Sequence, residues 1–303
     1  MAKYDKLVKK AKNAFEKKDY EKTIHYLEEA FQEKSLYEDL WTLGISYYFL
    51  DRFEEALECF KVFEDNLEPD GNVYQVMGDI YLDLGRKDLG LEYLLKAIEQ
   101  GNEVGNYFSV GLLYNELGDD EKEFEIYKKG IEVEPDHFWM NANLGSLYDK
   151  RGDAEKFLEY SLKAYEIDNT QNVVCYNLGI AYTNKQEYDK AIKYYLEEID
   201  KENGIIDAYL NLGLIYHYRD DGREKAKYYY LKGIEKEKDN SALWYNLGCL
   251  YVLENDYKNA NNCFLYSCLK DYKLYDYLLE DNDTKDYIKS EEFNDVKIQL
   301  GKI

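Results

Sequence analysis

Residues 241 to 254 read Ser-Ala-Leu-Trp-Tyr-Asn-Leu-Gly-Cys-Leu-Tyr-Val-Leu-Glu, and this stretch decides the fold. Trp244, Leu247, Gly248 and Tyr251 recur at offsets of three, four and seven residues, which is typical of a helix with one buried stripe. A glycine inside a helix costs about 1 kcal/mol relative to alanine, so its presence needs a structural reason. We infer that the missing side chain at Gly248 lets a partner helix approach closely.

The same glycine, and a tyrosine three residues after it, recur along the chain at intervals of 33 to 35 residues. The glycines are Gly44, Gly78, Gly111, Gly145, Gly179, Gly213 and Gly248, and the tyrosines are Tyr47, Tyr81, Tyr114, Tyr148, Tyr182, Tyr216 and Tyr251. About 12 residues after most of the glycines a small residue starts a second apolar stripe, as Ala191 does before Tyr195. Each unit is therefore predicted to be an αα-hairpin that cannot bury its stripes without neighbouring hairpins.

This pattern resembles the tetratricopeptide repeat, a 34-residue motif, most clearly in Ala242 to Gly248 and Asn177 to Tyr182. The resemblance implies an all-α fold, a right-handed superhelical solenoid of antiparallel helix pairs. Eight repeats are expected over residues 4–270, starting near residues 4, 37, 71, 104, 138, 172, 206 and 241. The pattern fades after residue 270, so residues 271–303 are expected to form a C-terminal helical cap.

Two repeats depart from the pattern in their second helix. In the fifth, Phe157 stands where a small residue is expected and Ala154 where other repeats have an aromatic residue, which indicates a volume-conserving exchange. In the fourth, Glu123 takes the small position, so either that helix is rotated or the register is locally wrong.

The composition and the motifs of the chain disfavour several classes of function. The formal net charge of −23 disfavours binding to nucleic acid or to anionic membranes. No apolar run approaches the roughly 18 residues of a membrane span, and the five scattered cysteines fit a reducing compartment, so we expect a cytoplasmic protein. No catalytic, cofactor or metal motif is present, and we predict neither an enzyme nor a bound cofactor.

The resemblance implies a concave face formed by repeat positions 2, 5, 6, 9, 12 and 13 of each first helix. Position 6 carries one asparagine in each of the last four repeats, and such amides can pair with both polar groups of an extended peptide backbone. Aromatic residues at position 5 are candidate anchors, and carboxylates on the same face favour a basic ligand. The asparagines are Asn143, Asn177, Asn211 and Asn246; the aromatic residues are Trp41, Phe108, Tyr176 and Tyr245; the carboxylates are Glu38, Asp79, Asp83, Glu116, Asp149 and Asp207.

A structural interpretation stays open for these residues, since the asparagines could bond to neighbouring repeats and the aromatic residues could belong to the core. Clustered lysine and arginine are missing from this face, which disfavours the acidic C-terminus of a heat-shock chaperone as the partner. We expect a protein-interaction scaffold that holds an extended or helical segment of a protein or peptide partner in its concave groove. The alternatives are a peptide-sensing regulator without a DNA-binding domain and a self-associating structural protein; the oligomeric state is left open.

Overall fold

The computed structural model describes residues 2–34, 36–66, 69–101, 105–219 and 221–302, and every regular element in these ranges is a helix. The predicted all-α fold is therefore confirmed. The chain divides into two compact units, Met1–Met140 (unit 1) and Asn141–Ile303 (unit 2), which we describe separately. The predicted start of the fourth repeat, residue 104, lies outside the described residues.

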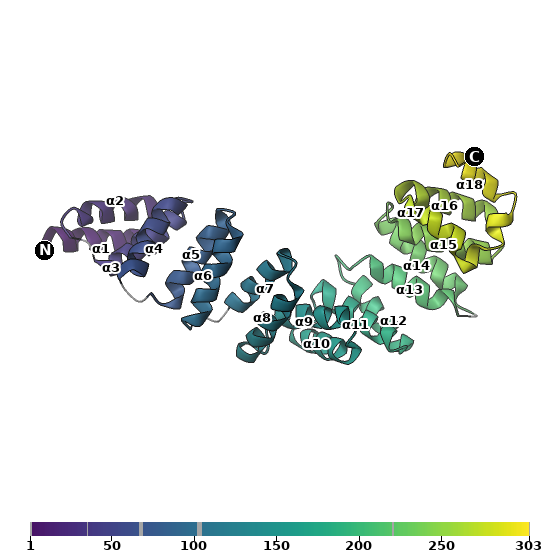
Figure 1. The fold of residues 1–303 in the computed structure, drawn as a ribbon, viewed down its shortest axis with the longest axis horizontal. Coiled ribbons are helices and arrows are strands. Elements are labelled where there is room, and N and C mark those ends of the chain that lie inside the picture. Colours follow the sequence, from purple (N-terminus) through teal and green to yellow (C-terminus); the bar gives the residue numbers. More distant parts are fainter. Residues whose placement is uncertain (1, 35, 67–68, 102–104, 220, 303) are drawn as a thin grey trace. The chain divides into compact units, whose positions relative to one another are not determined.

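Successive helices pair into hairpins, which Figure 1 shows following one another along each unit. Unit 1 contains α1 (Ala2–Glu16), α2 (Tyr20–Phe31), α3 (Tyr37–Tyr48), α4 (Phe53–Asn66), α5 (Gly71–Asp83), α6 (Lys87–Glu99), α7 (Asn106–Glu116) and α8 (Asp120–Val133), and α9 (Phe138–Lys150) follows. Unit 2 continues with α10 (Ala154–Ile167), α11 (Asn172–Asn184), α12 (Tyr188–Ile199), α13 (Asp207–His217), α14 (Arg223–Lys236), α15 (Ser241–Leu253) and α16 (Tyr257–Lys270).

The turn inside a hairpin is built from one residue with left-handed backbone followed by a helix cap. Gly118 and Gly152 have φ of 73° and 76°, a conformation that only glycine adopts without strain. The next residues, Asp119 and Asp153, each accept a hydrogen bond from a backbone N–H in the first turn of α8 and α10. These short polar turns are why each second helix starts where it does.

The recurring glycines permit the close approach expected from the sequence. At six of them a Cβ atom would lie between 2.1 and 2.9 Å from a large side chain of the second helix in the same hairpin. In the pair Gly213 and Tyr230, for example, the tyrosine ring is fully buried and occupies the space that a side chain would need. The six pairs are Gly44–Phe60, Gly78–Leu94, Gly111–Tyr127, Gly179–Tyr195, Gly213–Tyr230 and Gly248–Phe264.

The fourth and fifth hairpins, which depart from the sequence pattern, pack in different ways. At Gly145 the nearest atom to a Cβ would be the Cβ of Tyr160 at 3.4 Å, because Ser161 stands where the other hairpins have a large residue. Phe157 is buried one turn earlier, as the exchange of large and small residues predicts. In α8 the register is regular, since Tyr127 faces Gly111, and the buried Glu123 accepts a hydrogen bond from the Asn115 amide at 3.1 Å.

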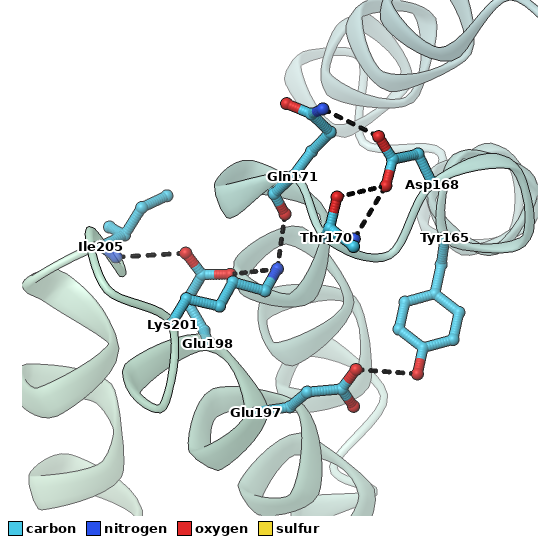
Figure 2. Close-up of polar contacts among 8 residues, drawn as sticks. All are labelled: Tyr165, Asp168, Thr170, Gln171, Glu197, Glu198, Lys201 and Ile205. Atoms are coloured by element: carbon cyan, nitrogen blue, oxygen red, sulfur yellow. Dashed lines mark hydrogen bonds and ion pairs between the residues drawn. The ribbon is translucent and has the colours of Figure 1, made fainter.

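Polar contacts stabilise the junctions between hairpins in unit 2 (Figure 2). The fully buried Glu198 carboxylate accepts hydrogen bonds from the Ile205 backbone N–H at 3.1 Å and from the Lys201 ammonium at 3.2 Å. Lys201 also donates to the carbonyl of Gln171, and the Tyr165 hydroxyl donates to Glu197 at 2.8 Å. Burial raises the pKa of Glu198, and these donors offset the cost of placing its charge there.

Four short elements follow the last hairpin: α17 (Lys273–Glu280), η1 (Asn282–Thr284), η2 (Tyr287–Lys289) and α18 (Phe293–Gln299). Helices α17 and α18 contact α16, and η1 contacts α15. Tyr287 and Phe293 are fully buried in the same cluster as Phe264 of α16. The C-terminal segment thus covers apolar surface of the last hairpin.

Candidate binding surfaces

A pocket of about 750 Å³ lies between the first helices of two neighbouring hairpins in unit 1. Trp41 and Glu38 of α3 form one side, and Val76 and Asp79 of α5 form the other. All four occupy the repeat positions that were expected to face a ligand. Phe63, Pro69, Asp70, Asn72, Val73 and Gln75 complete the lining.

The pocket combines an aromatic ring with negative charge. The Trp41 ring is partly exposed and is held edge-on against Phe60, with ring centroids 5.4 Å apart. Of the lining residues that the structure describes, three carry carboxylates and none is a lysine or arginine. Asp70 uses its carboxylate to cap α5, so Glu38 and Asp79 are the two carboxylates of the lining without this capping role.

The surroundings of the Asp79 carboxylate change its pKa. Burial, together with the charge of Asp83 one turn further along α5, raises the pKa of Asp79 to about 6. Because the Asp79 carboxylate is already partly desolvated, binding a cation costs it less desolvation energy than it would cost a fully solvated carboxylate. The charges of Asp83 and Asp79 and a hydrogen bond to Asp83 add to burial in raising the pKa of the Tyr48 hydroxyl to about 12.

The remaining predicted residues of unit 1 lie further along. Phe108 is half-buried, with its ring centroid 5.0 Å from that of His137. Glu116 is exposed and forms an ion pair with Lys87 at 2.7 Å. Neither residue lines the pocket between α3 and α5.

The four asparagines of unit 2 have different surroundings. The Asn211 amide donates to the Tyr195 hydroxyl of the preceding hairpin at 3.2 Å, and the Asn246 amide donates to the Ala242 carbonyl of its own helix at 2.9 Å. Asn177 is 8% exposed, and Asn143 is half-buried. Asn211 and Asn246 thus use their amide donors inside the chain.

The other predicted residues of unit 2 divide into exposed and buried ones. Asp149 accepts a hydrogen bond from Asn184 at 3.3 Å, and Asp207 is exposed near Tyr176. Burial raises the pKa of Tyr176, and the charge of Asp207 adds to this effect. Tyr245 has a buried ring, as the structural interpretation of these aromatic residues allowed, and its hydroxyl donates to Asp281 of the C-terminal segment at 2.6 Å.

Sequence reasoning missed a second cluster around Tyr245. His217, the last residue of α13, and Tyr218, which follows it, approach Asp283. Cys249 of α15 approaches Asp281. His217, Tyr218 and Cys249 stand at repeat positions 12, 13 and 9, and this is the signal by which they could have been found. Nothing in the repeat pattern indicated that the acidic run at residues 280–283 would dock on them.

Neither a metal-binding cluster nor a membrane-spanning helix occurs in the described parts of the chain. No group of three or more histidine, cysteine or carboxylate side chains there could hold a metal ion. No described helix is long and apolar enough to span a bilayer.

Comparison with known proteins identifies the repeat. Sequence models of the tetratricopeptide repeat match residues 71–100, 104–137, 140–171, 174–205 and 241–265, just over half of the chain. None of the curated proteins compared with the chain matches it.

Solved structures share the fold at low identity. The C-terminal part of a repeat-containing protein from Cytophaga hutchinsonii is 20% identical, covers 76% of this chain and 95% of its own, and has a TM-score of 0.59. YrrB, described as a TPR protein with an unusual peptide-binding site, is 21% identical over 60% of this chain and 94% of its own, with a TM-score of 0.53. A chain of the APC/C hetero-tetramer Cut9–Hcn1 is 14% identical, covers 88% of this chain and 52% of its own, and has a TM-score of 0.51. The chain belongs to the tetratricopeptide repeat family, whose members are protein-interaction scaffolds.

Proposed function

We propose that this scaffold binds a protein segment carrying lysine or arginine, with one basic side chain seated between α3 and α5. The observation that carries the proposal is the pocket of about 750 Å³ in which Trp41 stands beside the carboxylates of Glu38 and Asp79. A cation placed over an indole and next to carboxylates gains from both. An aliphatic stem would pack against Val76 and Trp41.

The size of the pocket supports a peptide rather than a free amino acid. A lysine side chain fills a small part of 750 Å³, so neighbouring residues of the ligand have room along α3 and α5. The exposed Asp83 lies one turn beyond Asp79 and could pair with a second basic residue. The similarity to YrrB, a protein described as having a peptide-binding site, is in keeping with such a ligand.

The asparagines of unit 2 are proposed to form a second surface, which binds the backbone of an extended segment. Asn177 is the most buried of the four and would contribute its amide to the same contacts. Asn143, Asn211 and Asn246 would contribute acceptors to backbone N–H groups of an extended segment. This part of the proposal is separate from the basic pocket, because it concerns backbone contacts and a different unit.

A peptide selection tests the basic pocket. Random dodecapeptides displayed on phage are selected on the full chain, and the enriched peptides are synthesised and measured by fluorescence anisotropy. We expect enrichment of lysine and arginine, and affinities at least ten times weaker for Trp41→Ala and Asp79→Asn. Asp88→Asn, an exposed carboxylate of α6 outside the pocket, is the matched control and should bind as the wild type does. Selection of neutral peptides, or equal affinity for the pocket variants, would overturn the proposal.

A further inference from the structure

The acidic run after α17 lies on ligand positions of the last two repeats. The Asp281 carboxylate accepts a hydrogen bond from the Tyr245 hydroxyl at 2.6 Å, and the Cys249 thiol is 3.8 Å from the same oxygen. The Asp283 carboxylate accepts from the Tyr218 hydroxyl at 3.2 Å. In the repeat frame Tyr218, Tyr245 and Cys249 occupy positions 13, 5 and 9, which are predicted to lie on the concave face.

A buried histidine completes this surface. His217 is 3% exposed, and its Nδ1 lies 3.3 Å from the Tyr230 hydroxyl. Its Nε2 has no hydrogen-bond partner within the described residues and points toward Asp283, whose carboxylate oxygen is 3.9 Å away. The His217 imidazole thus points toward the Asp283 carboxylate, but the two groups are too far apart for a hydrogen bond.

The donors on this surface select for anions. Two hydroxyl groups, a thiol and an imidazole face the segment, and His217 is the only basic group within 4.0 Å of Asp281 or Asp283 among the described residues. Charge-assisted hydrogen bonds from neutral donors to a carboxylate are stronger than those to a neutral acceptor. A basic segment would find no carboxylate on these helix positions, in contrast to the pocket between α3 and α5.

The spacing of the two carboxylates is set by a local turn. The Asp281 carboxylate also accepts from the backbone N–H of Asp283 at 3.0 Å, and the Thr284 hydroxyl donates to the Leu278 carbonyl at 2.7 Å. These bonds hold Asp281, Asn282 and Asp283 in one compact turn whose two acidic side chains reach α15 and α13 respectively. The surface therefore recognises an Asp-x-Asp turn and not a single charge.

We propose that the Tyr218, Tyr245 and Cys249 surface is a binding site for an acidic Asp-x-Asp segment of a partner protein, and that residues 281–283 occupy it in cis as a built-in competitor. A tethered segment acts at an effective concentration in the millimolar range, so a partner must bind more tightly or meet a loosened segment. The site is independent of the basic-segment pocket in unit 1, so either proposal can fail alone.

The test uses the full chain with Asp281→Asn and Asp283→Asn combined. Hydrogen exchange measured by mass spectrometry should show the amides of residues 281–286 exchanging at least ten times faster than in the wild type, with α13 and α15 unchanged. Asp276→Asn combined with Asp286→Asn is the control, because these exposed carboxylates flank the turn without contacting the surface. Unchanged exchange in the first variant would overturn the cis contact.

Binding in trans is measured with a fluorescein-labelled peptide of sequence Leu-Leu-Glu-Asp-Asn-Asp-Thr, which copies residues 278–284. We expect the Asp281→Asn, Asp283→Asn variant to bind it at least ten times more tightly than the wild type does. A peptide with asparagine at both aspartate positions should bind at least ten times more weakly. Adding Tyr218→Phe and Tyr245→Phe, with helicity checked by circular dichroism, should abolish the gain. If the loosened variant binds neither peptide, or both equally, the surface is no acidic-segment site.

Discussion

Replacing Asp79 by asparagine should make unit 1 more stable at pH 8 while weakening its ligand. Burial, followed by the charge of Asp83, raises the pKa of Asp79 from 3.8 to about 6. Each pKa unit corresponds to about 1.4 kcal/mol, so the difference amounts to about 3 kcal/mol as an upper limit. Because the side chain is partly exposed and screened, we expect a gain of about 1 to 2 kcal/mol.

The sign follows from proton linkage. With a raised pKa, folded Asp79 binds more protons than the unfolded chain between about pH 4 and 6, so its ionisation lowers stability as the pH rises through that window. The gain from Asp79→Asn should be complete at pH 8 and nearly absent at about pH 3, below the pKa of the unfolded carboxyl. Urea unfolding followed by circular dichroism, with hydrogen exchange of the α5 amides as a local measure, tests this. An equal gain at both pH values, or none at pH 8, would refute the reasoning, and Asp88→Asn should change neither.

Three further predictions concern packing and protonation. Gly145→Ala should raise the free energy of unfolding by about 0.5 to 1 kcal/mol, since its Cβ meets only ordinary contacts, whereas Gly213→Ala should lower it by about 1 to 3 kcal/mol against the buried Tyr230 ring; urea unfolding compares the two. Ser161→Ala should stabilise unit 2 by about 1 kcal/mol in the same assay, because its buried hydroxyl has no hydrogen-bond partner within the described residues, and a loss would contradict this. Burial lowers the pKa of His217, so its NMR titration midpoint should fall below 6.5. Because the unfolded histidine then gains its proton first, unit 2 should lose stability as the pH drops through 6.5. A midpoint above 6.5 would refute this.

The hairpins could be predicted because their signal is local and repeated. Gly179 and Tyr182 fix the phase of a helix, and the small residue Ala191 fixes its partner, so the pattern needs no tertiary information. The exchange at Phe157 was visible for the same reason, since volume is conserved inside one hairpin. The buried Glu123 left rotation or a register error open, and the structure shows a regular helix in which Asn115 bonds to the carboxylate.

The binding surfaces were only partly predictable. Trp41 and Asp79 follow from repeat positions, but that they share one pocket depends on the packing of α3 against its neighbours. Tyr245 was expected to face a ligand because its position does so in other repeats. Its burial by Asp281 depends on how an irregular segment folds back, and such a contact between distant residues leaves no periodic trace in the sequence.

The pairing of each recurrent glycine with a bulky residue of its own hairpin makes the array modular. Because a pair such as Gly78 and Leu94 lies within one hairpin, a substitution in one member can be compensated without reference to the next hairpin. The Gly145 hairpin shows such a local rearrangement, with regular pairs at Gly111 and Gly179 on either side. Ligand-facing positions can therefore diverge in one hairpin at a time, so that a single chain can carry an acidic pocket and an anion-selective surface on the same scaffold.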